Sequence, residues 1–495
     1  MKTRGRLVLI SILLTVCCAL VMLSGCQTTV VNRQSGQEGR YDVRKFGAAG
    51  DGRTDDSEAI KACIQAAQVS NVVFPCGTYR ITQNLSIPDT AELVFEEGAA
   101  LLLEEGIKVE LSGLVKAGNA QIFKGTGDIS GISGQAVGNP MWFGAAGDGK
   151  TDDTAAFQKA VDSFQEVKIP ASAKGYVLSG IILNRRMRLS GAENEKAVLI
   201  AAENAGDILT VRSSGVEISD LSFKMANTAS ACIYFDTSAK ALEQNRVSGI
   251  LAEQACCVVK DHGGNMVITT TFEDFDCRKG RGTAFTCNNM WGFIFLKNIR
   301  LDYSQSDCSI NFPALTVKKN AGMILNNVQV IGSTNSTSEA HGFVTDESEA
   351  IWWQNCTVTN VGGYGFRHTG SVNQHQYFQD CSVKNAASGG FYFDGNGRYL
   401  QLDGCSAEGG STGFRFAPSC RYAQLSNATV KGATGSGIHN QAAYSSIWKV
   451  TAENCGQYGV QSSAEGCTVV NVQGKGNRQG LYSISGDGSG ITSCP

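Results

Sequence analysis

Carboxylate, cationic and aromatic residues recur at one point of a strand pattern that repeats along the second half of the chain. Asp346 and Asp394 are the candidate catalytic pair, because they occupy the same point two repeats apart. Two repeats predict a backbone separation of about 10 Å, near that of the carboxyl groups of an inverting glycosidase. The candidate substrate-binding residues on the same predicted face are Arg367, Tyr392, Arg415 and His439. This mixture suits an acidic or neutral polysaccharide.

Asp236 and Asp261 continue this face toward the N-terminus and join the candidate substrate-binding residues. They lie one repeat apart, which predicts either the shorter spacing of a retaining glycosidase pair or joint binding of a cation. A lyase would instead need an arginine or lysine as base, for which Arg367 or Arg415 is placed, and calcium is then a candidate cofactor. A hydrolase would need no cofactor. The plainer alternative is that all these residues are ordinary solvated positions on a sheet face.

The element that positions these residues is a short strand entered through glycine. Each strand starts with an apolar residue, which predicts that this side chain points inward and that the next one points outward. The strand starts are Phe343, Phe366, Phe391, Phe414, Ile438 and Val460. Their outward neighbours are Val344, Arg367, Tyr392, Arg415, His439 and Gln461.

A second pattern also repeats once per coil. It begins each time with Asn, Asp or Gly at a turn, followed by an alternating strand such as Ile299-Arg300-Leu301 after Asn298. From Asn298 the successive turns are 29, 28, 25, 24 and 23 residues apart, the length of one coil of a parallel β-helix. We expect the turn residues to form an asparagine ladder between coils. Three cysteines share one inward position on consecutive coils, which suits a disulfide or a packed thiol stack; they are Cys356, Cys381 and Cys405.

Eleven residues starting at Phe46 reappear from Phe143 with ten positions identical. Each copy ends in paired aspartates and runs into a short amphipathic pattern, which predicts helices at about 55–67 and 153–164. The paired aspartates tempt a catalytic interpretation. We favour a structural one, because a carboxylate before a helix accepts hydrogen bonds from free N–H groups.

The string GAAGDGxTDD followed by such a helix resembles the N-terminal signature of pectate-lyase-superfamily domains, found in polygalacturonase-like enzymes and phage tailspikes. The resemblance implies an all-β fold, a right-handed parallel β-helix whose first rung is capped by such a short helix. It also implies a carbohydrate context. The polygalacturonase motifs are absent apart from Asp261-His262-Gly263-Gly264, which is loosely similar to Gly-His-Gly, and the pectate lyase pattern of calcium-binding aspartates is absent too. The resemblance therefore supports the fold more than any reaction.

The first 26 residues are predicted to be a lipoprotein signal peptide, because a basic start precedes an apolar run that ends in Leu23-Ser24-Gly25-Cys26. Lipid on Cys26 would anchor an exported bacterial protein to the periplasmic or cell-surface face of a membrane. Residues 27–40 are predicted to be a flexible tether. Residues 41–137 form a truncated β-helix module, and residues 138–495 the main β-helix.

Composition narrows the function. A net charge of −3 offers no basic surface for nucleic acid, and the five dispersed histidines and the lack of a CxxC pair predict no metal site. The sequence therefore predicts a surface-anchored protein that cleaves a glycan as a hydrolase or lyase. The alternative is a non-catalytic glycan-binding or structural β-helix lipoprotein. The sequence leaves the oligomeric state open.

Overall fold

The computed structural model describes residues 39–131, 135–192, 196–203, 205–225, 231–371 and 373–492, and of residues 373 and 492 only the backbone. The residues from Tyr41 onward form one compact unit. The predicted signal peptide, the lipidation residue Cys26 and nearly all of the predicted tether lie outside the described residues.

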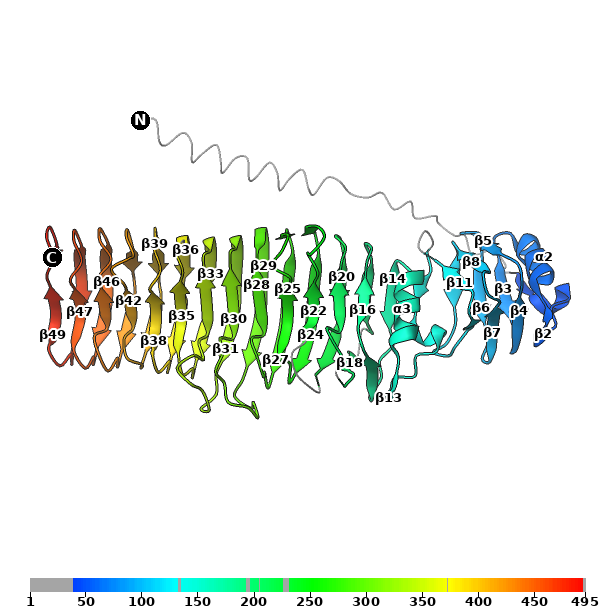
Figure 1. Ribbon diagram of the computed structural model, residues 1–495, viewed down its shortest axis with the longest axis horizontal. Coiled ribbons are helices and arrows are strands. Elements are labelled where there is room, and N and C mark those ends of the chain that lie inside the picture. Colours follow the sequence, from blue (N-terminus) through cyan, green and yellow to red (C-terminus); the bar gives the residue numbers. More distant parts are fainter. Residues whose placement is uncertain are drawn as a thin grey trace, which may run out of the picture. The chain divides into compact units, whose positions relative to one another are not determined.

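Within the compact unit, short strands are stacked coil upon coil along one axis (Figure 1). The two α-helices of the described residues are α2 (Ser57–Ala67) and α3 (Thr154–Ser163), and short 3-10 helices η1 (Val43–Phe46) and η2 (Pro140–Phe143) precede them. The predicted all-β class and both predicted capping helices are confirmed.

The N-terminal strands from β2 to β11 form three small parallel sheets. The strands that precede the main coils are β1 (Arg40–Asp42), β2 (Asp51–Asp55), β3 (Asn71–Phe74), β4 (Gly77–Ile81), β5 (Leu85–Ile87), β6 (Glu92–Phe95), β7 (Ala99–Leu103), β8 (Lys108–Leu111), β9 (Leu114–Lys116), β10 (Phe123–Gly125) and β11 (Asp128–Ser130).

The main coils build two long parallel sheets, of 13 and 26 strands in the described part of the chain. The thirteen-stranded sheet contains β16 (Ile181–Leu183), β19 (Leu209–Val211), β22 (Ala231–Phe235), β25 (Cys257–Asp261), β28 (Phe285–Asn288), β30 (Leu315–Lys318), β32 (Phe343–Asp346), β35 (Tyr364–Thr369), β38 (Gly389–Phe393), β42 (Phe414–Phe416), β45 (Ile438–Asn440), β47 (Tyr458–Ser462) and β49 (Gly480–Ile484).

The 26-stranded sheet covers the other sides of each coil. Its first half is β12 (Val137–Gly138), β13 (Asp148–Asp152), β14 (Glu166–Ile169), β15 (Gly175–Leu178), β17 (Arg188–Gly191), β18 (Ala197–Ala201), β20 (Glu217–Ser219), β21 (Leu221–Lys224), β23 (Leu242–Glu243), β24 (Arg246–Glu253), β26 (Val267–Ile268), β27 (Thr271–Arg278) and β29 (Met290–Asp302). Its second half is β31 (Ala321–Ile331), β33 (Glu349–Gln354), β34 (Thr357–Thr359), β36 (Asn373–Gln379), β37 (Ser382–Lys384), β39 (Gly397–Arg398), β40 (Gln401–Asp403), β41 (Ser406–Glu408), β43 (Gln424–Ser426), β44 (Thr429–Lys431), β46 (Ser446–Glu453), β48 (Thr468–Gln473) and β50 (Gly490–Thr492).

The predicted turn column is confirmed. Its residues take the left-handed backbone conformation with φ between 50° and 65°; they are Asp220, Asp274, Asn298, Asn327, Asn355, Asp380, Gly404 and Asn427. Asn298 Nδ2 donates to Asp274 Oδ1 at 2.9 Å, and Asn327 Nδ2 donates to Asn298 Oδ1 at 3.1 Å. Asn and Asp tolerate this conformation and satisfy polar groups in the turns, so the residues that break one strand also tie each coil to the next.

The core of the main coils is a column of stacked side chains. Phe366 packs between Phe343 and Phe391, with 4.8 Å between ring centroids on each side, and the column continues through Phe414. These rings are buried, as the alternation predicts. Cys356, Cys381 and Cys405 are also buried inward, as free thiols.

The duplicated loops have the expected structural role, but the second aspartate of each pair does not cap its helix. Asp153 instead accepts hydrogen bonds from the loop amides of Ala146 and Gly147, at 2.6 and 3.2 Å. Asp152, one residue earlier, accepts from the amide of Thr154 at the start of α3. Asp55 and Asp56 repeat this arrangement in the first copy. The motif therefore fixes the loop that leads into each helix.

Candidate functional site

The outward face of the thirteen-stranded sheet carries the predicted polar stripe. Arg367 pairs in register with Tyr392, Tyr392 with Arg415, and Arg415 with His439. All four side chains are partly exposed, whereas the preceding residue of each strand is buried. The predicted placement of these four residues on one face is confirmed, and their role in binding stays a prediction.

Asp394 lies at the centre of this stripe, one residue past the end of β38. Its Oδ2 is 3.6 Å from Nη2 of Arg367. Its Oδ1 is buried and has no hydrogen-bond partner among the described residues. Burial raises the pKa of Asp394, and the positive charge of Arg367 opposes this rise only in part.

The two arginines beside Asp394 are also incompletely paired. The guanidinium carbon of Arg415 is 4.9 Å from the centre of the Tyr392 ring. The Nε atoms of Arg367 and Arg415 are both buried without a hydrogen-bond partner in the described part of the chain. Buried polar atoms are normally paired, so three unpaired atoms in one cluster mark a place where a ligand or water completes the hydrogen bonds.

The sequence missed the residues that lie against Arg367. His341 Nδ1 accepts the amide N–H of Tyr364 at 2.9 Å, so the proton of the neutral ring is on Nε2, which contacts Arg367 Nη1 at 2.9 Å without accepting a hydrogen bond from it. The Tyr364 ring lies 4.8 Å from the Tyr392 ring. Burial, aided by Arg367, lowers the pKa of His341 to about 4, so this ring is neutral near pH 7. The sequence signal for this contact was the position of His341 at the end of the unusually long loop of residues 332–341.

That loop packs against a second one. Thr337 N donates to Ile310 O at 2.9 Å, which joins residues 332–341 to residues 303–314. Figure 1 shows loops that extend past the coils beside β30 and β31. His341, the last residue of the loop 332–341, therefore brings these two packed loops into contact with the stripe.

Asp346, the second predicted catalytic residue, faces the same side of the sheet. Asp346 pairs in register with Thr369 on the next coil. The amide of Asp394, one coil further on, donates to the carbonyl of His368, the residue before Thr369. The two carboxylates are thus two coils apart, about 10 Å at the backbone. Lys318 Nζ is 3.3 Å from Asp346 Oδ2, so each aspartate has its own cation.

His439 closes the stripe on the C-terminal side. Burial first, and then the charge of Arg415, lowers the pKa of His439. The ring is therefore neutral near pH 7 and can both donate and accept hydrogen bonds.

The predicted pairing of Asp236 with Asp261 is wrong. Asp261 pairs in register with Phe235, an inward residue, and is 1% exposed. Its Oδ1 accepts the amide of Asn288 at 2.6 Å, and Oδ2 has no partner among the described residues. Burial raises the pKa of Asp261 to about 7. The two carboxylates lie on opposite faces of the strand layer, so they cannot share a cation, and Asp261 does not reach the predicted binding face.

Asp236 stays on the outward face. Ser238 Oγ donates to it at 2.6 Å and Arg212 Nε at 2.8 Å. The bond from Ser238 is the main cause of a lowered pKa.

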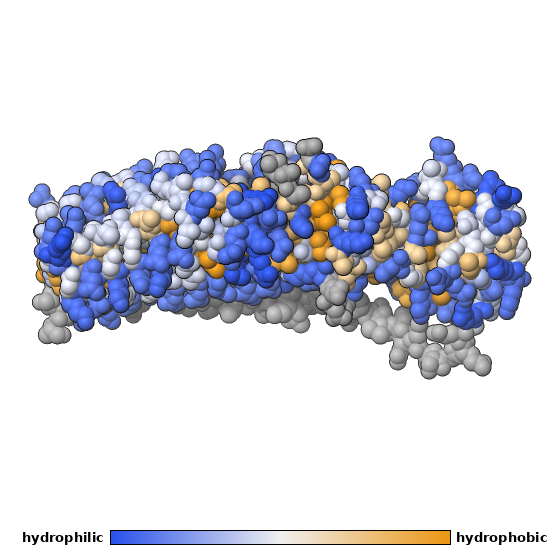
Figure 2. Space-filling model, turned by 90° about the horizontal axis from the view of Figure 1, so that it is seen from below, coloured by the Kyte–Doolittle hydropathy of each residue, from blue (hydrophilic) through white to orange (hydrophobic). Residues whose placement is uncertain are grey.

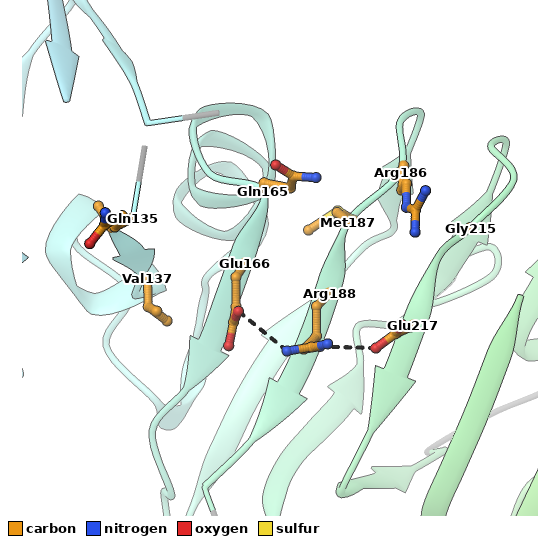
Figure 3. A pocket seen from close by; sticks show the side chains of 10 residues that line it. Gln135, Val137, Gln165, Glu166, Arg186, Met187, Arg188, Gly215 and Glu217 are labelled. Atoms are coloured by element: carbon orange, nitrogen blue, oxygen red, sulfur yellow. Dashed lines mark hydrogen bonds and ion pairs between the residues drawn. The ribbon is translucent and has the colours of Figure 1, made fainter. Parts of the chain in front are cut away.

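A pocket of about 280 Å³ lies elsewhere, on the first coils of the 26-stranded sheet (Figure 3). Arg188 at its centre bonds Glu217 at 2.9 Å and lies 3.5 Å from Glu166, and the three residues are in register on successive strands. Arg188 is paired with a glutamate on each side, so the pocket is a charge ladder of the sheet surface and not a second candidate site. Figure 2 shows a largely hydrophilic surface with separate hydrophobic patches.

Among the described residues, no group of three or more His, Cys, Asp or Glu side chains is arranged to hold a metal ion. No helix in the same residues is long and apolar enough to cross a membrane.

Comparison with known proteins agrees with the fold. A family model described as "Rhamnogalacturonase A/epimerase, pectate lyase-like" matches residues 41–105, and one described as "Right handed beta helix region" matches residues 313–494. Together with the stacked parallel coils, these matches show a right-handed parallel β-helix whose first segment is similar to pectate-lyase-like proteins.

Individual relatives are distant. The chain is 34% identical over 93 residues to alginate lyase 7 of Azotobacter vinelandii, which is 16% of this chain and 11% of the lyase. The catalytic domain of a GH87 α-1,3-glucanase in complex with tetrasaccharides is 14% identical with a TM-score of 0.39, covering 68% of this chain and 66% of that one. The A-module of the mannuronan C-5 epimerase AlgE4 of Azotobacter vinelandii is 12% identical with a TM-score of 0.32, covering 91% and 100%. The chain thus spans about a tenth of the alginate lyase and just under two thirds of the glucanase domain.

Proposed function

We propose that this protein binds a polysaccharide along the outward face of the thirteen-stranded sheet and cleaves it at the cluster around Asp394. The observation that carries the proposal is the set of three buried, unpaired polar atoms: Arg367 Nε, Asp394 Oδ1 and Arg415 Nε. Sugar hydroxyl and carboxylate groups would complete their hydrogen bonds. The cluster has two cations, Arg367 and Arg415, and one carboxylate, Asp394, so its excess positive charge favours a polysaccharide that carries carboxylates.

Each residue then has a defined task. The raised pKa of Asp394 keeps a larger fraction of it protonated than in an ordinary aspartate, so Asp394 donates a proton to the leaving glycosidic oxygen. Asp346, two coils away, removes a proton from the water that attacks the sugar on the opposite side. Tyr392, with Arg415 over its ring, and His439 hold the neighbouring sugars.

The relatives give the proposal a chemical context. Their names include an alginate lyase, an α-1,3-glucanase and a mannuronan epimerase, all of which act on polysaccharides. Calcium, the candidate cofactor of the lyase alternative, stays a prediction.

The test compares wild type with Asp394→Asn and Asp346→Asn on polygalacturonate, alginate and α-1,3-glucan. New reducing ends report cleavage, and ultraviolet absorbance of a new C=C bond separates a lyase from a hydrolase. Each variant should lose about 10²–10⁴-fold in rate and keep its affinity for the polymer. Glu408→Gln removes an exposed carboxylate of the other sheet, paired with Lys384, and serves as the matched control. A wild type that binds these polymers without cleaving them supports the non-catalytic alternative.

We further propose that Cys26 carries lipid and holds the protein at the periplasmic or cell-surface face of a membrane. The basic start, the apolar run and the small residues before Cys26 support this. The full chain expressed in a bacterium should partition into the detergent phase, and Cys26→Ala should move it to the aqueous phase. Equal partition of both chains would contradict the anchor.

A further inference from the structure

The tripeptide Tyr392-Phe393-Asp394 of the candidate site has a second copy, Tyr234-Phe235-Asp236, on the same sheet. In both copies phenylalanine is fully buried, while tyrosine and aspartate face outward. Both tripeptides end a strand of the thirteen-stranded sheet, β22 in one case and β38 in the other, and Figure 1 shows these strands far apart along the stack.

The contacts of the two copies match as well. Lys260 pairs in register with Tyr234, and its Nζ is 5.8 Å from the ring centre, as Arg415 pairs with Tyr392 at 4.9 Å. Asp236 binds an arginine of the preceding coil, Arg212 at 2.8 Å, as Asp394 binds Arg367. Each copy is therefore a tyrosine covered by one cation beside an aspartate paired with another.

The two aspartates differ in one respect. Asp236 accepts hydrogen bonds from the amide and hydroxyl of Ser238 and from Arg212, and these bonds hold its pKa low. It stays a carboxylate and has no proton to give. Asp394 keeps an unpaired oxygen and a raised pKa. The first cluster can bind a sugar but cannot supply the acid that cleavage requires.

The surface between the clusters is open to an extended chain. Six strand steps separate β22 from β38, which is about 29 Å at the spacing of neighbouring strands. In the column that joins Lys260 to Arg367 the intervening outward residues are small, namely Thr286, Thr316 and Val344. Along this column a straight polymer lying parallel to the stack would meet both clusters without a large side chain in between, and the exposed cation Lys318 of the neighbouring column would lie beside it.

We propose that Tyr234, Lys260, Asp236 and Arg212 form a second, non-reacting subsite for the same polysaccharide chain that is cleaved at Asp394. The inference rests on the proposed function. Binding at one cluster holds the chain near the other, so a chain long enough to span about 29 Å gains affinity without any new contact at the reacting point. The protein would therefore select its substrate by length.

The experiment measures the affinity of the full chain carrying Asp394→Asn for trisaccharides and for long chains of polygalacturonate and alginate. Tyr234→Ala with Lys260→Ala should weaken binding of long chains at least tenfold and leave trisaccharide binding within twofold. The matched control is Trp448→Ala with Lys449→Ala, which removes a similar exposed pair, 4.6 Å apart, from the other sheet and should change neither affinity.

The outcomes separate the two proposals. Two results would overturn the second subsite and leave the proposed function intact. One is equal affinity of the Asp394→Asn chain for short and long polymers, and the other is an equal loss of affinity for both lengths when Tyr234 and Lys260 are also replaced. Failure to bind either polymer at any length would overturn the proposed function itself. Unchanged urea midpoints would show that the variants remain folded.

Discussion

Removing the buried charge of Asp261 should remove a destabilisation of this β-helix that grows as the pH rises. The side chain is 1% exposed, one of its oxygens is unpaired, and burial raises its pKa from the ordinary 3.8 to about 7. In Asp261→Asn the amide oxygen can still accept the N–H of Asn288, and the charge is gone.

The sign follows from proton binding. Between about pH 4 and pH 7 the folded chain holds a proton on Asp261 that the unfolded chain has lost, so the contribution of Asp261 to the free energy of unfolding falls as the pH rises, whereas buried His341, with its pKa lowered to about 4, contributes with the opposite sign. A shift of about 3 pKa units corresponds to about 4 kcal/mol, at about 1.4 kcal/mol for each pH unit. Asp261→Asn should therefore match wild type near pH 4 and exceed it by about 4 kcal/mol near pH 8.

Urea unfolding followed by tryptophan fluorescence across this pH range measures the difference. Asp236→Asn is the matched control, because the lowered pKa of Asp236 contributes stability that is lost as the pH falls, so this variant should be weaker at high pH. If Asp261→Asn kept the same slope of stability against pH as wild type, the argument from burial would be refuted.

Two further predictions concern the stack itself. Asn298→Ala removes both ladder bonds at a residue with φ of 54° and should lower the free energy of unfolding by about 1–3 kcal/mol, and Asn298→Gly should recover the backbone part of this loss. Phe366→Ala opens the aromatic column between Phe343 and Phe391 and should cost about 3–5 kcal/mol. Urea midpoints test both, and a loss below 0.5 kcal/mol, the usual range of surface substitutions, would contradict either.

Local patterns predicted the fold because each coil repeats the same backbone problem. A left-handed turn needs Asn, Asp or Gly, so Asn298, Asn327 and Asn355 could be aligned from sequence alone. Alternation then placed Arg367 and Tyr392 on one face, because each directly follows a single phenylalanine that is buried and is itself preceded by glycine.

Alternation failed where several apolar residues are adjacent. Cys232 and Ile233 in β22, and Val258 and Val259 in β25, are all buried, so hydrophobicity cannot decide between two registers one residue apart. A shift of one residue moves a side chain to the opposite face, and this turned Asp261 inward. The contact of His341 with Arg367 could not be predicted from the sequence for another reason, because the packing of a long loop depends on residues far away in the sequence.

Because each coil adds one strand to the thirteen-stranded sheet, the span between the two Tyr-Phe-Asp clusters changes only in whole coils. Removal of residues 298–326, the 29 residues of one turn-to-turn repeat, would keep the residues of both clusters and bring Asn327 above Asp274 in place of Asn298, with the loss of Lys318 beside Asp346 and of the loop of residues 303–314. The clusters would then move closer by a single step of about 4.8 Å. The number of coils thus sets the distance between the two clusters in fixed steps. A change in coil number, without any change in the residues of the two clusters, is enough to change the polymer length that the protein selects.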